Sequence, residues 1–412
     1  MEILERFLNY IAIDTTSNSK STTTPSTPNQ KILAQKIVEE LQEMGVRNIY
    51  HDTKYGYIYA TIEGNPSLKK IGFLTHLDTS EDAKGGNINA NIIKNYDGED
   101  IRLNDTVTSK VSSYPDLKNH KGKTLITTDG TTLLGADDKA GIAEVMTMVE
   151  YFCQNDVDHG DIYLCFTPDE EIGRGTDHID LSRFTPDFAY TIDGSHLGEI
   201  SYENFNAATA TIEISGVSTH TGSGKGIMVN SLLLAIEIDN QLPDELPSNT
   251  EGYEGFYHLK EITGNMEKSK MQYLIRDFDK KHFEYRKNLL DEIVNKLNKK
   301  YNNCINIEIK DTYYNMKEII EKNIDIVDNV KLAMKKLGIK PLIVPIRGGT
   351  DGTSLTYQGL PCPNIGTGGH NFHGVNEYIA LEDMEKTVEV LIEIAKQNTL
   401  TNDHKAPQKI KV

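Results

Sequence analysis

The sequence predicts an α/β protein in which a smaller domain interrupts a larger one. Strand-like and helix-like segments alternate over the first half of the chain, which is typical of a mainly parallel sheet. Residues 208–316 instead follow the βαββαβ order of a ferredoxin-like unit, and the alternation then resumes. The length of 412 residues also favours two or three domains. We therefore expect a discontinuous domain at 1–207 and 317–412 and an inserted domain at 208–316.

Two periodicities define the elements of the larger domain. Apolar residues at helical spacing predict helices at 2–10, 30–44, 139–152, 324–336 and 381–397. Short apolar runs predict buried strands at 57–62, 71–77, 162–167, 188–192, 342–346 and 363–366. Residues 17–29 are rich in Ser, Thr and Pro, so we expect a surface loop there.

The inserted domain has its own pattern. Strands are expected at 209–214, 257–264, 271–277 and 305–311, and helices at 228–242 and 281–300. Together these segments make a complete ferredoxin-like unit.

Composition excludes several classes of protein. The 61 acidic residues exceed the 43 basic ones, and a net charge of −18 argues against a nucleic-acid partner. No run approaches the roughly 18 apolar residues that span a bilayer, so we expect a cytoplasmic protein without a membrane partner. The four cysteines lie far apart without a Cys-x-x-Cys pair, which favours buried free thiols.

His76 and Asp78 form the first candidate site, at the end of a predicted strand. Alternation along the strand points both side chains to one side, where open α/β sheets bind ligands. The imidazole can bind a metal through one nitrogen while the carboxylate orients the other. A structural histidine is the alternative.

Two acidic pairs follow. Asp137 and Asp138 precede a predicted helix, so they are expected either to cap it or to leave one carboxylate facing a cleft. Glu170 and Glu171 follow an apolar strand, where the alternative is a solvated acidic turn. In a catalytic site, one of these two would bind a metal and the other would act as general base.

Further candidates stand in glycine-rich turns. Asp193 follows one apolar run, and His370 and His373 follow another. The glycine-rich segments at 348–352 and 366–369 match neither nucleotide-binding pattern, so a nucleotide site is not expected. Two histidines and three carboxylates at strand ends of one domain would suit a pair of zinc ions, as in two-metal aminopeptidases.

Taken in order, these motifs resemble the peptidase T family of tripeptide aminopeptidases, in the dizinc aminoacylase and carboxypeptidase superfamily. The likeness covers nearly the whole chain, including the segments at 250–259 and 346–352. It implies a catalytic zinc-peptidase domain, an inserted lid that also dimerises, and two Zn²⁺ per subunit. It also implies a homodimer that releases the N-terminal amino acid from tripeptides.

The resemblance assigns roles to individual residues. It implies that His76 and Asp193 hold one zinc, that Glu171 and His373 hold the other, and that Asp137 bridges them. Asp78 would orient His76, and Glu170 would act as general base and acid. His220 would stabilise the oxyanion, although Thr221 stands where the family often has proline.

Substrate binding leaves alternatives open. Arg276 would bind the C-terminal carboxylate of the tripeptide, with an ordinary ion pair at the strand end as the alternative. Because zinc ligands do not set the substrate class, a related acyl-amino-acid hydrolase or carboxypeptidase is a second reading. A third reading is a metal-binding protein without catalysis. Glu170 argues against it, because a protein that only binds metal needs no general base.

Overall fold

The computed structural model describes residues 1–397, and the chain forms two compact units. The first unit contains Met1–Tyr202, Ile319–Val344 and the described residues from Thr350 onward. The second contains Glu203–Glu318 and Pro345–Gly349. Within residues 1–397, no helix is both long enough and apolar enough to span a membrane.

An eight-stranded sheet forms the centre of the first unit, in the order β1-β2-β8-β3-β9-β16-β10-β15. Its strands are β1 (Asn48–His51), β2 (Ile58–Ile62), β3 (Ile71–His76), β8 (Ile162–Thr167), β9 (Phe188–Gly194), β10 (Glu199–Ser201), β15 (Leu342–Ile343) and β16 (Asn364–Gly366). Neighbouring strands β8, β3, β9 and β16 run parallel, whereas β1–β2, β2–β8 and β10–β16 pair antiparallel. The predicted α/β class is confirmed, with a mixed sheet whose central strands are parallel.

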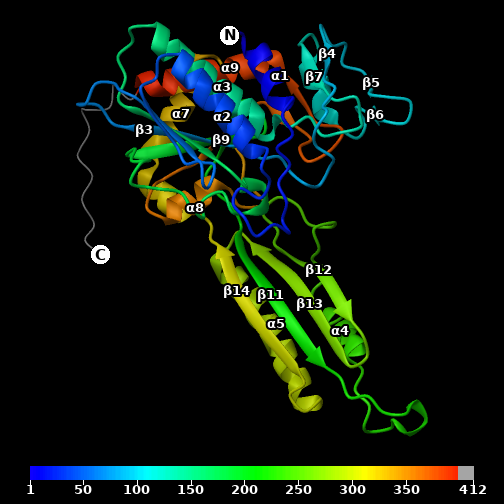
Figure 1. The fold of residues 1–412 in the computed structure, drawn as a ribbon. Helices are drawn as coiled ribbons and strands as arrows, with labels where there is room; N and C mark the ends of the chain where they lie inside the picture. Colours follow the sequence, from blue (N-terminus) through cyan, green and yellow to red (C-terminus); the bar gives the residue numbers. More distant parts are fainter. Residues whose placement is uncertain (398–412) are drawn as a thin grey trace. The chain divides into compact units, whose positions relative to one another are not determined.

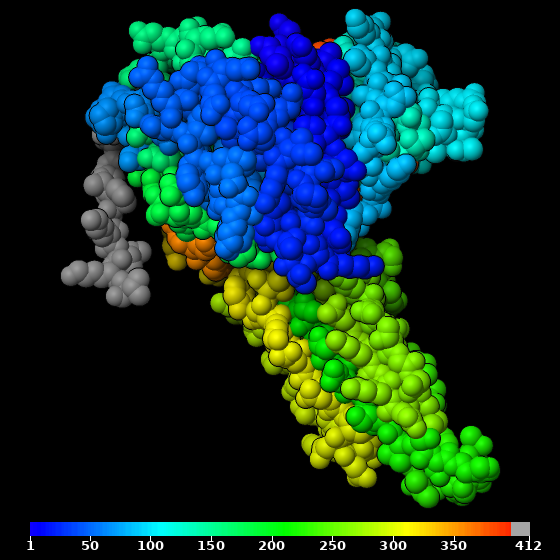
Figure 2. Space-filling model, viewed as in Figure 1, coloured from blue at the N-terminus to red at the C-terminus, as the bar shows by residue number. Residues whose placement is uncertain are grey.

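Helices cover this sheet. They are α1 (Ile3–Ile11), α2 (Gln30–Glu43), α3 (Ala136–Gln154), α7 (Asp325–Lys336), α8 (Asp351–Tyr357) and α9 (Leu381–Gln397). Helices α1, α3 and α9 pack together, and α3 also packs on β3 and β9 (Figure 1). Helix α1 buries Ile3, Phe7 and Tyr10, which recur at helical spacing along one face. In the space-filling view α1 and α2, in blue, lie on the visible surface of this unit (Figure 2).

A second, smaller sheet was not predicted from the sequence. It has the order β17-β18-β7-β4, with β4 at Asn91–Ile93, β7 at Leu125–Thr127, β17 at Gly369–His370 and β18 at Tyr378–Ala380. A separate pair joins β5 (Ile101–Arg102) and β6 (Thr108–Ser109). Strands of two or three residues are too short to show a period, and tertiary pairing alone reveals them.

The second unit has the predicted βαββαβ order. Its elements are β11 (Asn206–Ser215), α4 (Ser231–Asp239), β12 (Phe256–Gly264), β13 (Lys268–Asp277), α5 (Lys280–Lys300) and β14 (Ile305–Tyr313). The strands pair antiparallel in the order β12-β13-β11-β14. The segment α6 (Lys317–Ile320) follows.

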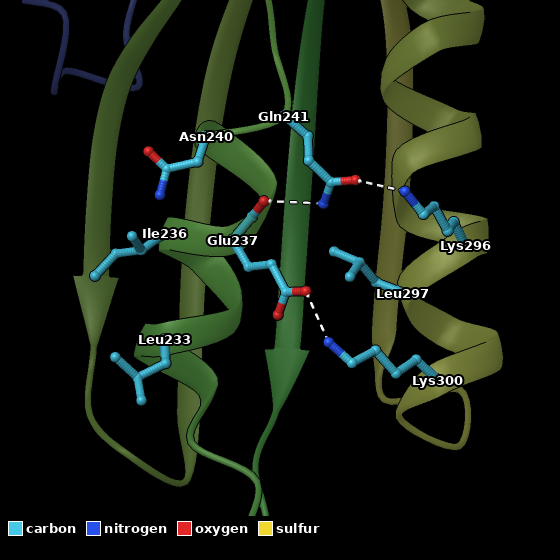
Figure 3. Close-up of a pocket in the computed structure, with 8 residues that line it drawn as sticks. All are labelled: Leu233, Ile236, Glu237, Asn240, Gln241, Lys296, Leu297 and Lys300. Atoms are coloured by element: carbon cyan, nitrogen blue, oxygen red, sulfur yellow. Dashed lines mark hydrogen bonds and ion pairs between the residues drawn. The ribbon is translucent and has the colours of Figure 1, made fainter.

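A groove of about 710 Å³ lies between α4 and α5 of the second unit (Figure 3). Leu233 and Ile236 line it from α4, and both side chains are exposed. Across the groove Lys300 of α5 pairs with Glu237 of α4 at 3.0 Å. Apolar side chains therefore line the groove beside the ion pair that crosses it.

Candidate dinuclear metal centre

Three predicted motifs meet because their strands are neighbours. His76 is the last residue of β3, and Asp193 lies near the end of β9. Glu170 and Glu171 follow β8 in the short 3-10 turn η2 (Glu170–Ile172). Strands β8, β3 and β9 are adjacent and parallel, so their carboxyl ends share one edge of the sheet.

Asp137, in the first turn of α3, lies between two imidazoles. Its Oδ1 is 2.8 Å from Nε2 of His76, and its Oδ2 is 3.3 Å from Nε2 of His373. The same nitrogen of His76 lies 3.3 Å from Asp193 Oδ1, and that of His373 lies 3.0 Å from Glu171 Oε2. Each imidazole thus faces one oxygen of Asp137 and one of a second carboxylate. We call these five residues the metal cluster.

Negative charge is concentrated in this buried place. Burial, followed by the charge of Asp137, raises the pKa of Glu171 to about 8. Burial raises the pKa of Asp193 to about 6 and that of Glu170 well above its usual range. Burial opposes protonation of His373, yet its hydrogen bonds with Asp137 and Glu171 raise its pKa to about 11.

The residues present fit a divalent cation. Glu171 Oε1 is buried and has no hydrogen-bond partner among the described residues. Ligand atoms of His76, Asp137 and Glu171 lie within 4.8 Å of one another, as do those of His76, Glu170 and Asp193. Imidazole nitrogens and carboxylate oxygens are the ligands that zinc takes in catalytic sites.

Asp138 has a different position from its neighbour. Its side chain is fully buried, and its Oδ2 accepts the backbone N–H of His76 at 3.0 Å. Asp137 and Asp138 have non-helical backbone angles at the start of α3, and no side chain of the described residues makes a capping hydrogen bond there. The helix-capping interpretation of this pair is therefore wrong.

Asp78 contacts both neighbouring motifs. Its carbonyl oxygen accepts a hydrogen bond from His76 Nδ1 at 3.0 Å, and its Oδ1 lies 3.4 Å from the same nitrogen. Because a carbonyl only accepts, Nδ1 donates to it, and Nε2 is the nitrogen that faces Asp137. The two carboxylate oxygens of Asp78 accept the backbone N–H groups of Glu170 and Glu171 at 2.9 and 3.2 Å.

Glu377 was missed by the sequence analysis. This buried carboxylate accepts the backbone N–H groups of Leu134 and Gly135 at 2.7 and 2.8 Å and that of Asp137 at 3.2 Å. It holds the loop that positions Asp137. Glu377 and this loop are far apart in sequence, so no local pattern marks it.

His370 belongs to a separate group, which we call the histidine cluster: Asp116, His120, His196 and His370. Nε2 of His370 lies 3.1 Å from Nε2 of His120, and the His196 and His370 rings are 4.5 Å apart. Asp116, His196 and His370 also bring ligand atoms within 4.8 Å of one another. Asp116 and His196 are half exposed, whereas His370 is buried.

The remaining candidates lie in the second unit. His220 is exposed, and its Nδ1 accepts the backbone N–H of Gly222 at 3.1 Å. Arg276 donates to the carbonyls of Ala208 and Ile275 and lies over the ring of Tyr313. No carboxylate of the described residues pairs with Arg276, so the expected ion-pair alternative is not observed.

Comparisons with known proteins agree with this site. The model of the family "Peptidase family M20/M25/M40" matches residues 125–397. Peptidase T of Caldanaerobacter subterraneus is 51% identical over 95% of this chain and 98% of its own length. Peptidase T of Bacillus subtilis is also 51% identical, over 96% and 98%.

Solved structures show the same fold. Aminopeptidase PepT from Bacillus cereus superposes with a TM-score of 0.76 at 20% identity, over 97% of this chain and 98% of that one. A dinuclear metal-binding M20 peptidase from Bacillus subtilis gives 0.62 at 12% identity, over 96% of each chain. The family match and the identity over nearly the full length confirm the resemblance found in the sequence. The chain is a metallopeptidase of the M20/M25/M40 family and belongs to its peptidase T group.

Proposed function

We propose that this protein is a tripeptide aminopeptidase, which hydrolyses the first peptide bond and releases the N-terminal amino acid. The observation that carries the proposal is the position of Asp137, whose two oxygens face two imidazoles, each with a further carboxylate. Full-length relatives named peptidase T support the substrate class.

The metal cluster would hold two divalent ions, for which we propose zinc. His76 and Asp193 would hold one, Glu171 and His373 the other, and Asp137 would take part in both sites. Bound there, the metals would lower the pKa of a water molecule toward about 7 and polarise the scissile carbonyl.

Glu170 is the proposed proton carrier. The backbone N–H of Glu170 donates to Asp78 Oδ1 at 2.9 Å, and this hydrogen bond fixes the backbone of Glu170 beside the metal cluster. It would accept a proton from the attacking water and deliver it to the departing amine, a role worth roughly 10²- to 10⁴-fold in rate. Glu171, the adjacent residue, points instead toward His373.

The second unit would supply two further groups. His220 is proposed to donate to the developing oxyanion. Its Nδ1 accepts the N–H of Gly222, and its Nε2 forms no hydrogen bond with a residue of the described range 1–397. Arg276 is proposed to bind the substrate carboxylate, and it has no acidic partner among residues 1–397. The predicted homodimer, cytoplasmic location and lid role stay predictions.

The first experiment measures amino-acid release by the zinc-loaded protein. A free-amine tripeptide, its N-acetylated form and the matching tetrapeptide are compared at equal concentration. We expect rapid release from the free tripeptide alone, since both the amine and the length are recognised. Faster cleavage of the acetylated peptide would identify an acylase instead. No release from any of them, with zinc present, would indicate a metal-binding protein without catalysis.

A further inference from the structure

We propose that the Ser/Thr-rich loop at residues 17–29 is a positioning element of the active site. It would act through the buried side chain of Asp169 to hold the turn that carries Glu170 and Glu171. This inference rests on the proposed function, because it assigns the loop to the proposed general base.

The turn after β8 is very short. Turn η2 is a single 3-10 turn of three residues, Glu170–Ile172. It lies between Asp169 and Gly173, which are both in the left-handed region with φ of 59° and 70°. Such a short turn depends on hydrogen bonds from neighbouring segments for its position.

Asp169 supplies those hydrogen bonds on one side. Its carboxylate is completely buried and accepts from the backbone N–H of Ser26 at 2.7 Å, from Ser26 Oγ at 2.5 Å and from Gln30 Nε2 at 2.8 Å. The amide of Gln30 also accepts the backbone N–H of Asp169 at 3.2 Å. Asp169 forms no ion pair with a described residue, so neutral donors at the end of the loop and the start of α2 stabilise this buried charge.

The start of the loop is fixed to the other motif. The backbone N–H and the hydroxyl of Ser17 both donate to the carbonyl of Thr79, at 3.0 and 3.1 Å. Thr79 follows Asp78, whose carboxylate accepts the N–H groups of Glu170 and Glu171. The loop therefore bonds at its start to the segment after β3 and at its end to the turn after β8. Asp78 connects the same two segments directly.

Glu170 depends on this arrangement more than Glu171 does. Glu171 contacts His373, whereas no hydrogen bond to the carboxylate of Glu170 is formed by a described residue. The position of Glu170 therefore follows that of its turn. A displacement of about 1 Å is enough to cost about 10²-fold in rate.

The test compares variants of the zinc-loaded protein on a free-amine tripeptide. We expect Asp169→Asn to lower kcat about 10²-fold and Ser26→Ala about 10-fold, with zinc content and KM unchanged. Ser26→Thr keeps the hydroxyl and should restore most of the rate. Ser19→Ala removes an exposed hydroxyl of the same loop and is the matched control.

A double variant separates positioning from stability. In the Glu170→Gln protein, adding Ser26→Ala should leave the residual rate unchanged, because the positioned group is already lost. A further 10-fold loss there would show a merely structural role and overturn the proposal. So would a kcat for Asp169→Asn within about twofold of the Ser19→Ala control, while the proposed function would stand. Normal turnover by Glu170→Gln itself would overturn both.

Discussion

The metal cluster and the histidine cluster both combine imidazoles with carboxylates, but the pKa of a histidine is raised in the first and lowered in the second. In the metal cluster, carboxylates on every side raise the pKa of His373 to about 11 despite burial. In the histidine cluster, burial and then the neighbouring His120 and His196 lower the pKa of His370 to about 3. Burial lowers the pKa of a histidine in both places, and only in the metal cluster do hydrogen bonds with carboxylates outweigh it.

This difference shows that the number of histidines is a poor guide to a metal site. Three imidazoles meet in the histidine cluster, where Asp116 is half exposed and the buried carboxylates of Asp383 and Glu199 lie 3.3 Å from His120 and 3.4 Å from His196. Two imidazoles meet in the metal cluster, and a buried carboxylate faces both. A carboxylate that faces two imidazoles, each with a further carboxylate of its own, distinguishes the site that we propose to bind metal.

The largest expected effect comes from Asp137→Ala. This change removes the carboxylate that faces both imidazoles, so zinc content should fall from about two ions per chain to fewer than one, with activity lost. Metal analysis of the purified variant, together with tripeptide cleavage, measures it. Asp116→Ala in the histidine cluster is the matched control and should retain both. Equal metal loss in the two variants would contradict the distinction between the clusters.

Glu170→Gln separates chemistry from metal binding within the same buried region. The amide keeps the size of the side chain but cannot accept the proton, so we expect kcat to fall roughly 10²- to 10⁴-fold with zinc retained. Steady-state kinetics and metal analysis on one preparation check this. Loss of zinc together with the rate would instead make Glu170 a ligand.

A smaller effect is expected from Glu377→Gln, which weakens the support of Asp137. Orienting partners of ligands typically change metal affinity by about 10- to 100-fold, and we expect a loss of that size. Competition with a chelator measures it. Glu382→Gln is the control, because Glu382 also accepts a backbone N–H, that of Thr124, outside the metal cluster. Unchanged affinity in Glu377→Gln would show that the loop holds its position without this carboxylate.

The smallest effect concerns the histidine cluster and pH. The unfolded chain protonates His370 near pH 6.5, whereas the folded chain does so only near 3. The unfolded state therefore binds more protons between these values, and stability falls as the pH falls, by about 1.4 kcal/mol per unit. Between pH 6.5 and 5 the natural protein should lose about 1.6 kcal/mol more than His370→Phe, because the unfolded histidine is already half protonated at pH 6.5.

Urea unfolding at both pH values, under the same metal conditions, measures this difference. His282→Phe, at an exposed position, is the control and should behave like the natural protein. Parallel pH curves for His370→Phe and the natural protein would mean that His370 is protonated in the fold.

Local patterns were sufficient for most elements. The predicted strand at 162–167 matches β8, and the βαββαβ order of the second unit is observed. The thiols were predicted less well, since Cys153 is exposed and Cys304 partly so, whereas Cys165 and Cys362 are buried. Periodicity indicates a face of a helix but not how completely a neighbour covers it.

Periodicity and turn residues are local properties, so the sequence was enough to predict the α/β class, the βαββαβ order of elements and the residues available for metal chemistry. The tertiary structure alone decided which of these residues meet. The adjacency of β8, β3 and β9 places Glu171, His76 and Asp193 at one edge. Contacts between distant segments also bring Glu377 to the Asp137 loop and Ser26 to Asp169. Such contacts depend on strand order and on the packing of far-apart segments, which no short stretch of sequence encodes.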